Sequence, residues 1–433
     1  MLPRGLWCGA RGLSVNSGAT KALPTSCDVA IAGGGFGGLS IFYHLLLKGQ
    51  ANVCLFEKLR VGYGSHVLPS GWLSAGHLWQ SQDAQRVATR SLQIMRSLSQ
   101  TYPAVCVEEC GRLMMASTDE TVRNLQRMSS AATALGMMPE FLTRSDIQNR
   151  FHIEPGAKFK KGLFLPQDCI VDSGALHHAL LNEISRLGGQ VVEDCGIEAV
   201  TLDNSNRVTG VETEGGPVPC ATFINAAGEH SNHVKVRNRP VGLSQLPMYP
   251  QPSSHMLIKC NLQISSIIHD LDSNVMIVPG MDAINTNLYI CTGYQKPERD
   301  QKVPGRASHE GDTQRKEYPE DWDTFYPVLT SLTDQFPFLA DAVVDRLCSG
   351  LEPVTSDGYV CMGEHPYMQD YYAFGGWGGH GLSMALGAGE VLADWIVTGR
   401  KPSTGVDQLD IARFLPLHYS EKYLRERAPE VFG

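Results

Sequence analysis

Residues 27–38 read CDVAIAGGGFGG, a short apolar run that breaks into a glycine-rich turn. The helix-length segment 39–49 follows and ends in Lys48 and Gly49, as helix C-termini commonly do. Residues 52–57, NVCLFE, form a second apolar run that is closed by an acid. The order strand, glycine turn, helix, strand and acid is the fingerprint of a dinucleotide-binding βαβ unit.

The fingerprint gives each residue a physical task. Gly33, Gly35 and Gly38 satisfy GxGxxG, in which glycines turn the chain tightly and let backbone N–H groups approach a pyrophosphate. The helix N-terminus adds partial positive charge, and Glu57 would accept hydrogen bonds from an adenosine ribose. A purely structural turn is the alternative, and the flanking strand and helix argue against it. The predicted dinucleotide-binding residues are Gly33, Gly35, Gly37, Gly38, Glu57 and Lys58.

Two later features favour FAD over NAD. The run 221–225 leads into Ala226-Ala227-Gly228, and residues 375–381, GGWGGHG, open a helix-like run over 382–397. A helix N-terminus with bare backbone amides would stabilise the negative charge that reduction places on a flavin ring, whereas a nicotinamide acquires no such anion. The alternative is that the glycines of 375–381 serve only the close packing of a loop. The residues predicted to contact FAD here are Ala227, Gly228, Gly378, Gly379, Gly381 and Leu382.

The remaining pattern predicts an α/β (α+β composite) fold. A helix is expected over 173–187, and strands are expected at 190–193, 197–202, 208–214 and 221–225, with a turn at 215–217. Apolar and polar residues alternate between 253 and 294, which predicts an antiparallel sheet with one side that faces solvent or a ligand. Residues 296–323 are dense in charge and are expected to form a solvated loop.

These elements predict a Rossmann-like FAD-binding domain interleaved with a mainly antiparallel substrate domain. We assign residues 27–105, 160–240 and 345–433 to the first and residues 106–159 and 241–344 to the second.

Composition narrows the possible functions. The formal charge of −9 argues against nucleic-acid binding, and the sequence contains no run of 18 apolar residues that would span a membrane. The 12 cysteines and 14 histidines form no CxxC or HExxH pair, so we predict no metal site.

The N-terminal segment has a composition of its own. Residues 1–26 carry Arg4, Arg11, Lys21 and several hydroxyl residues but no acid, which is typical of a mitochondrial transit peptide; a frayed terminus is the alternative. Without residues 1–27, the chain would keep 33 basic and 45 acidic residues, a formal charge of −12.

Several motifs together resemble a known family. The chain is similar to the flavin-bearing half of the dimethylglycine and sarcosine dehydrogenases and to the pyruvate dehydrogenase phosphatase regulatory subunit, which are FAD-dependent oxidoreductases of the glycine oxidase/D-amino-acid oxidase type. The resemblance covers about residues 27–427. Besides the glycine turn and Glu57, the resemblance rests on the stretches 74–80 (SAGHLWQ), 210–213 (GVET), 225–228 (NAAG), 353–357 (PVTSD), 362–364 (MGE), 394–396 (DWI) and Gly399-Arg400. It implies that Ser74, Ala75 and Gly76 also contact FAD.

The sequence departs from this family at three points. Leu73 occupies the position of the histidine that bonds covalently to the flavin in the two dehydrogenases, so we predict non-covalent FAD. His66 or His77 could substitute, although a surface or packing role is favoured for both. Glu229-His230 replaces the aromatic residue that commonly follows Ala-Ala-Gly. The resemblance covers only the flavin-bearing half, so we expect no folate-linked half.

The resemblance implies oxidation of a secondary or tertiary amine, such as dimethylglycine or sarcosine, by hydride transfer to flavin, in the mitochondrial matrix. The electron acceptor would be an electron-transfer flavoprotein or oxygen. The catalytic candidates are Trp377 and His380, from their glycine setting, and His255, Tyr249 and Tyr294, from the predicted sheet. The competing hypothesis is a regulatory, flavoprotein-like subunit without turnover, and a third is an oxygen-using amino-acid oxidase.

Overall fold

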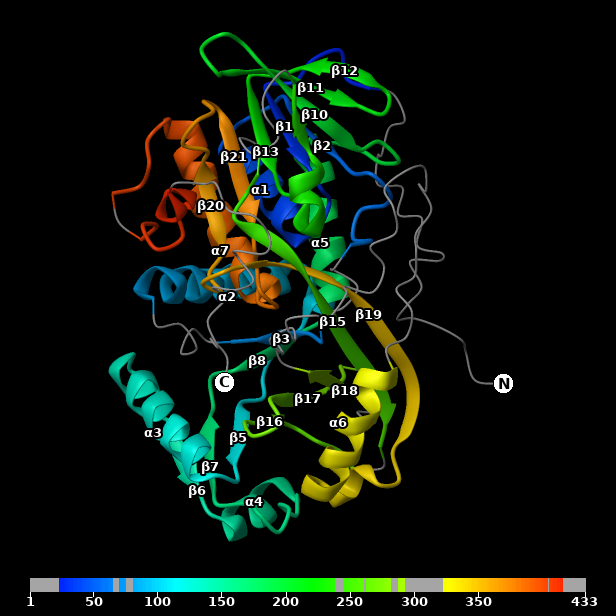
Figure 1. Cartoon of the computed structure of the whole chain (residues 1–433), viewed down its shortest axis with the longest axis vertical. Coiled ribbons are helices and arrows are strands. Elements are labelled where there is room, and N and C mark those ends of the chain that lie inside the picture. Colours follow the sequence, from blue (N-terminus) through cyan, green and yellow to red (C-terminus); the bar gives the residue numbers. More distant parts are fainter. Residues whose placement is uncertain are drawn as a thin grey trace.

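The computed structural model describes residues 23–64, 70–74, 81–237, 245–260, 262–281, 287–292, 322–403 and 405–415. A six-stranded sheet and an eight-stranded sheet organise this part of the chain (Figure 1). The mixed α/β prediction is therefore confirmed.

The six-stranded sheet has the order β20-β21-β13-β1-β2-β9 and is parallel except for the β20–β21 pair. Its strands are β1 (Val29–Ala32), β2 (Val53–Phe56), β9 (Gln190–Val192), β13 (Thr222–Asn225), β20 (Cys361–Glu364) and β21 (Tyr371–Gly375). The predicted strand–turn–helix–strand unit forms its centre, with β1 between β2 and β13.

Helices cover one face of this sheet. They are α1 (Phe36–Leu47), α2 (Gln82–Thr101), α5 (Ser173–Arg186) and α7 (Gly381–Thr398). Val29 and Ile31 point into the core beneath these helices, whereas Ala30 and Ala32 point into a second core on the opposite face. Both faces of β1 are therefore buried, which explains why its sequence is continuously apolar rather than alternating.

A four-stranded sheet contributes the second core. It has the order β12-β11-β10-β14, with β10 (Ile197–Leu202), β11 (Val208–Thr213), β12 (Gly216–Pro219) and β14 (Lys235–Val236). The turn expected at 215–217 was too long: Gly216 and Pro217 already pair with β11. Pro217 is compatible with a strand here because β12 lies at the sheet edge, where its missing N–H is tolerated.

The eight-stranded sheet has the order β19-β15-β18-β17-β16-β5-β7-β6. Its strands are β5 (Arg112–Ala116), β6 (Glu140–Leu142), β7 (Lys161–Leu165), β15 (Met248–Lys259), β16 (Ile267–Asp270), β17 (Val275–Pro279), β18 (Asn287–Thr292) and β19 (Val343–Thr355). All pairs are antiparallel except β16–β5, so the antiparallel sheet predicted between 253 and 294 is present.

Three further helices lie around the eight-stranded sheet: α3 (Asp119–Ala134), α4 (Arg144–Phe151) and α6 (Trp322–Gln335) (Figure 1). A small sheet, β3 (Trp72–Leu73), β8 (Cys169–Val171) and β4 (Val107–Glu109), lies between the two large ones. Figure 1 also shows β15 and β19 as a long ribbon that leads from the six-stranded sheet into the eight-stranded one. The predicted domain boundaries stay a prediction; β7, within 160–240, belongs to the eight-stranded sheet.

Candidate active site

The glycine turn between β1 and α1 packs against the end of β13. Gly33 has φ +100°, and a Cβ built on it would lie 2.5 Å from the carbonyl oxygen of Ala226. A Cβ built on Gly38 would lie 1.8 Å from the carbonyl oxygen of Gly33. Both positions therefore require glycine, the first also because L side chains rarely adopt that φ.

The N-terminus of α1 presents backbone amides without a side-chain cap. Gly35 is the N-cap residue, and the first turn contains no acid. A Cβ built on Gly35 would meet no heavy atom of the described residues within 4 Å, so the space above this turn is open. Uncapped amides and an open cradle are what a pyrophosphate needs.

Glu57 follows β2 and supports the turn from below. Its Oε2 accepts a hydrogen bond from the Gly34 N–H at 2.7 Å, and its Oε1 accepts one from the Leu59 N–H at 2.9 Å. Burial raises the pKa of Glu57, and these two hydrogen bonds oppose that rise. A carboxylate has about four acceptor positions, so Glu57 retains capacity for the predicted ribose hydroxyls. Lys58, predicted beside it, is exposed and lies against Gly196.

Ala226, Ala227 and Gly228 lead from β13 into the 3₁₀ helix η3 (Gly228–His233) beside the glycine turn. The next residue, Glu229, has a side chain that is only 11% exposed. Burial, with smaller contributions from the charges of Glu57 and Glu352, raises its pKa to about 7. The substitution of a carboxylate for the family's aromatic residue thus places a group that ionises near neutrality beside the dinucleotide turn.

The second glycine cluster turns the chain between β21 and α7. Gly376, Gly378 and Gly379 all have positive φ, between +54° and +81°. Trp377 lies against the α1 turn: a Cβ built on Gly37 would lie 2.8 Å from its Cζ2, and its ring centroid is 5.0 Å from that of Phe374. The side chain of Trp377 therefore joins the starts of α1 and α7.

His380 is the N-cap residue of α7 and makes no side-chain cap hydrogen bond. Its ring centroid lies 5.6 Å from that of Trp72. Burial, assisted by the positive charge of Arg112, lowers the pKa of His380 to about 4, so its imidazole is neutral at pH 7. Like α1, α7 begins with its amides uncapped by a side chain, at a glycine-rich turn.

The segment that resembles the covalent-flavin region lies close to α7. The Ser74 N–H donates a hydrogen bond to Oγ of Ser383 at 3.1 Å, and Leu382 is buried beside it in the first turn of α7. Leu73, on β3, is 2% exposed and belongs to the core beneath the helices. The predicted site residues Ala75, Gly76 and Tyr294, and also His66 and His77, lie outside the described residues.

The remaining catalytic candidates, Tyr249 and His255, lie on β15. Tyr249 is 2% exposed and pairs with Val354 of β19. His255 is partly exposed; its Nδ1 lies 3.8 Å from Sγ of Cys291, and its Nε2 lies 3.4 Å from Oγ of Ser253. Because residues two apart on a strand share a face, the buried Tyr249 and the partly exposed His255 lie on the same face of the sheet.

Two charged groups near the site escaped sequence reasoning. Arg112, on β5, is 0% exposed, and its Nε lies 3.0 Å from Oδ2 of Asp168. Its guanidinium also lies over the ring of Trp72, 5.2 Å from the centroid. Glu352, on β19, lies beside Gly379 and immediately precedes the 353–357 motif. No local sequence pattern indicates the position of Glu352, which depends on how β19 pairs with β15.

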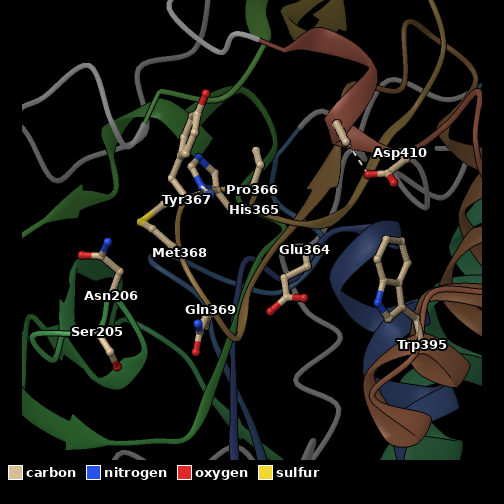
Figure 2. Close-up of a pocket in the computed structure, with 11 residues that line it drawn as sticks. Ser205, Asn206, Glu364, His365, Pro366, Tyr367, Met368, Gln369, Trp395 and Asp410 are labelled. Carbon is tan, nitrogen blue, oxygen red and sulfur yellow. Dashed lines mark hydrogen bonds between the residues drawn. The ribbon is translucent and has the colours of Figure 1, made fainter.

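A surface cavity lies elsewhere, at the edge strand β20 (Figure 2). It has a volume of about 500 Å³, and Figure 2 shows Glu364, Tyr367 and Trp395 among its lining residues. None of the predicted site residues lines it. Across the described part of the chain, no group of three His, Cys, Asp or Glu residues could hold a metal ion. The described helices also include none that is long and apolar enough to cross a bilayer.

Comparison with known proteins agrees with this geometry. Residues 28–395 match the family model for FAD-dependent oxidoreductases. The chain belongs to this family. The family that the sequence motifs resemble, that of FAD-dependent oxidoreductases, is thereby confirmed.

Among curated proteins, this FAD-dependent oxidoreductase is 29% identical to the mouse mitochondrial pyruvate dehydrogenase phosphatase regulatory subunit, over 98% of this chain and 47% of that protein. It is 24% identical to mouse mitochondrial sarcosine dehydrogenase, over 98% of this chain and 45% of that protein. The chain thus spans about half the length of these relatives. Among solved structures, L-proline dehydrogenase from P. horikoshii superposes with a TM-score of 0.76 at 20% identity, over 90% of this chain and 98% of that one.

The residues of this FAD-dependent oxidoreductase fit its cofactor. The open cradle at Gly35 suits a pyrophosphate, and the acceptor positions left on Glu57 suit a ribose. Two helices whose N-terminal amides carry no side-chain cap lie side by side, since α1 and α7 pack against each other and Trp377 touches both starts.

Proposed function

We propose that this chain oxidises a secondary or tertiary amine, and specifically an N-methylated amino acid such as dimethylglycine or sarcosine. The supporting observation is that Glu352, on the same face of the eight-stranded sheet as His255, lies beside Gly379 at the start of α7. The similarity to sarcosine dehydrogenase along almost the whole chain supports the same substrate class.

FAD, when bound, would supply the acceptor for a hydride equivalent from the carbon next to the amine nitrogen. The residues of this chain would bind and orient the two reactants. The α1 amides and Glu57 would hold the dinucleotide, and the α7 amides would stabilise negative charge on the ring. His380 stays neutral at pH 7 and therefore adds no competing positive charge beside the substrate amine.

FAD would be held non-covalently. Leu73, at the position of the family's covalent histidine, has a buried hydrocarbon side chain that offers no nucleophile. Mitochondrial localisation belongs to the same proposal, supported by the mitochondrial relatives and by the acid-free residues 1–26. An electron-transfer flavoprotein or oxygen would reoxidise the flavin.

Anaerobic mixing of the purified holoprotein with dimethylglycine, sarcosine and other N-methyl amino acids tests the activity. We expect the flavin absorbance near 450 nm, the ordinary band of oxidised flavin, to bleach with at least one amine. Readmitted air, followed by a peroxide assay, then separates an oxidase from a dehydrogenase. If no amine bleaches the flavin, the oxidation proposal is wrong.

The second candidate is a regulatory subunit that binds FAD without turnover. The 29% identity to the phosphatase regulatory subunit favours it, as does Glu229 in place of the family's aromatic residue. This hypothesis predicts the opposite pair of results: no bleaching by any amine, together with binding of a pyruvate dehydrogenase phosphatase catalytic subunit.

A further inference from the structure

Glu352 lies where the eight-stranded sheet meets the second glycine cluster. On β19 it pairs directly with Gln251 of β15. Because directly opposed residues and residues two apart on a strand share a face, Glu352 lies on the same face as Ser253 and His255. Cys291 of β18 pairs with His255 and extends this face.

The carboxylate of Glu352 points toward the start of α7. Its Oε2 lies 3.3 Å from a Cβ built on Gly379, the residue before His380. The side chain of Ser253 forms a hydrogen bond with it. The charge of Glu352 also acts on Cys291 and on Glu229 of η3, raising the pKa of both. The group therefore lies between the polar sheet face and the two turns that would surround the cofactor.

The negative charge of Glu352 has no cationic partner within the described part of the chain. Neither a lysine nor an arginine there forms an ion pair with it, whereas Asp168, another buried acid, contacts Arg112. Burial raises the pKa of Glu352 to about 7. A partly buried carboxylate of this kind loses hydration without a compensating charge, and a bound cation would restore that compensation.

We propose that Glu352 binds the positively charged amine group of the substrate. This inference rests on the proposed function and deepens it, because it assigns recognition of a cationic amine to one side chain. A secondary or tertiary ammonium N–H would donate a charge-assisted hydrogen bond to the carboxylate, next to the α7 amides that would face the flavin.

Two ligands of nearly equal shape test this assignment. Dimethylglycine and 3-methylbutanoate both carry a carboxylate and two methyl groups, but only dimethylglycine has an ammonium nitrogen. The holoprotein is first reduced with dithionite, so that the amine binds without being oxidised. Titration calorimetry at pH 8, where Glu352 is ionised, then gives the two dissociation constants for the wild type and for Glu352→Gln.

The wild type should prefer dimethylglycine, and Glu352→Gln should weaken dimethylglycine binding by about 10- to 100-fold while leaving 3-methylbutanoate binding unchanged. Glu352→Asp should retain part of the preference. Asp345→Asn, which changes a carboxylate on the same strand that pairs with Lys259 at the surface, should behave as wild type. FAD content and unfolding temperature verify that each variant folds.

An unchanged preference in Glu352→Gln, an equal loss for both ligands, or no preference in the wild type would overturn the assignment. The proposed oxidation is judged separately, by bleaching of the oxidised wild type. If an amine bleaches the wild type but Glu352→Gln keeps the ligand preference, only the role of Glu352 is rejected. If Glu352→Gln loses the preference for dimethylglycine but no amine bleaches the wild type, only the oxidation proposal is rejected.

Discussion

The Cα hydrogen of Gly38 points at the carbonyl oxygen of Gly33, so closely that a Cβ in its place would lie 1.8 Å from that oxygen. This contact allows α1 to start directly over the end of β1. The neighbouring Gly35, in contrast, faces open space. The same turn therefore contains glycines that the fold requires, Gly33 and Gly38, and one, Gly35, that only a ligand would require.

Gly38→Ala should destabilise the protein, because its Cβ would collide with backbone that cannot rotate away. We expect the free energy of unfolding to fall by about 3 kcal/mol or more, with loss of bound FAD. Urea denaturation followed by circular dichroism measures the loss. A variant that unfolds at the wild-type urea concentration would contradict the geometry of this turn.

Gly35→Ala is the matched variant. Its Cβ meets no described atom within 4 Å, so the apoprotein should unfold within about 0.5 kcal/mol of the wild type. The same Cβ would occupy the space predicted for the pyrophosphate, so FAD should bind at least about tenfold more weakly. Fluorescence titration of apoprotein with FAD checks this. Wild-type FAD affinity would place the pyrophosphate away from Gly35.

Asp168→Asn should be among the more damaging single substitutions outside the glycine clusters. It would leave the fully buried Arg112 without its ionised partner, and loss of one member of a buried pair typically costs about 3–5 kcal/mol. Equilibrium denaturation of the apoprotein measures the cost. Asp345→Asn, which breaks the exposed pair with Lys259, should cost less than about 1 kcal/mol. Similar costs for the two variants would show that burial of the Arg112 pair is unimportant.

Glu229 should make the apoprotein less stable as the pH rises. Its folded pKa of about 7 lies above the ordinary value of 4.5, so the folded state holds this proton more tightly than the unfolded state does. The stabilising contribution of protonated Glu229 is complete below pH 4.5. It decreases as the pH rises and is lost once the pH has passed 7. Glu229→Gln removes this titration. The free energy of unfolding of the variant, relative to that of the wild type, should therefore be higher at pH 8 than at pH 5 by roughly 1–3 kcal/mol.

Denaturation curves at pH 5 and pH 8 test this change, and Glu198→Gln, at an exposed position on β10, is the control. The control should show no pH-dependent gain. A gain of the same size in both variants would assign the effect to net charge rather than to the burial of Glu229.

Acid precipitation should release all of the FAD into the supernatant, because the buried hydrocarbon side chain of Leu73 offers no nucleophile for a covalent bond to the flavin. Absorbance of the supernatant near 450 nm, compared with that of the intact holoprotein, gives the released fraction. Yellow colour retained in the pellet would contradict non-covalent binding. Mass spectrometry of the tryptic peptides would then locate the attachment.

The sequence predicts the parts of this fold that neighbouring residues determine. The unit from β1 to β2 is visible because its strand, turn and helix are contiguous, and α5 was placed to within one residue. The partnership of Arg112 with Asp168 was not predictable, because it depends on the loop 166–168 returning to β5. The position of Glu352 beside Gly379 likewise depends on how β19 pairs with β15, a register that no local pattern reports.

The contact between Gly33 and Ala226 has a consequence for biosynthesis. The pyrophosphate cradle begins near the start of the chain, yet its neighbours come from β13 and, through Trp377, from the turn before α7. Closing such distant segments together is slow compared with forming local structure. During translation, the cradle therefore cannot be completed until most of the chain has left the ribosome. We expect stable FAD capture to be a late, post-translational event, and nascent chains truncated before residue 377 to lack it.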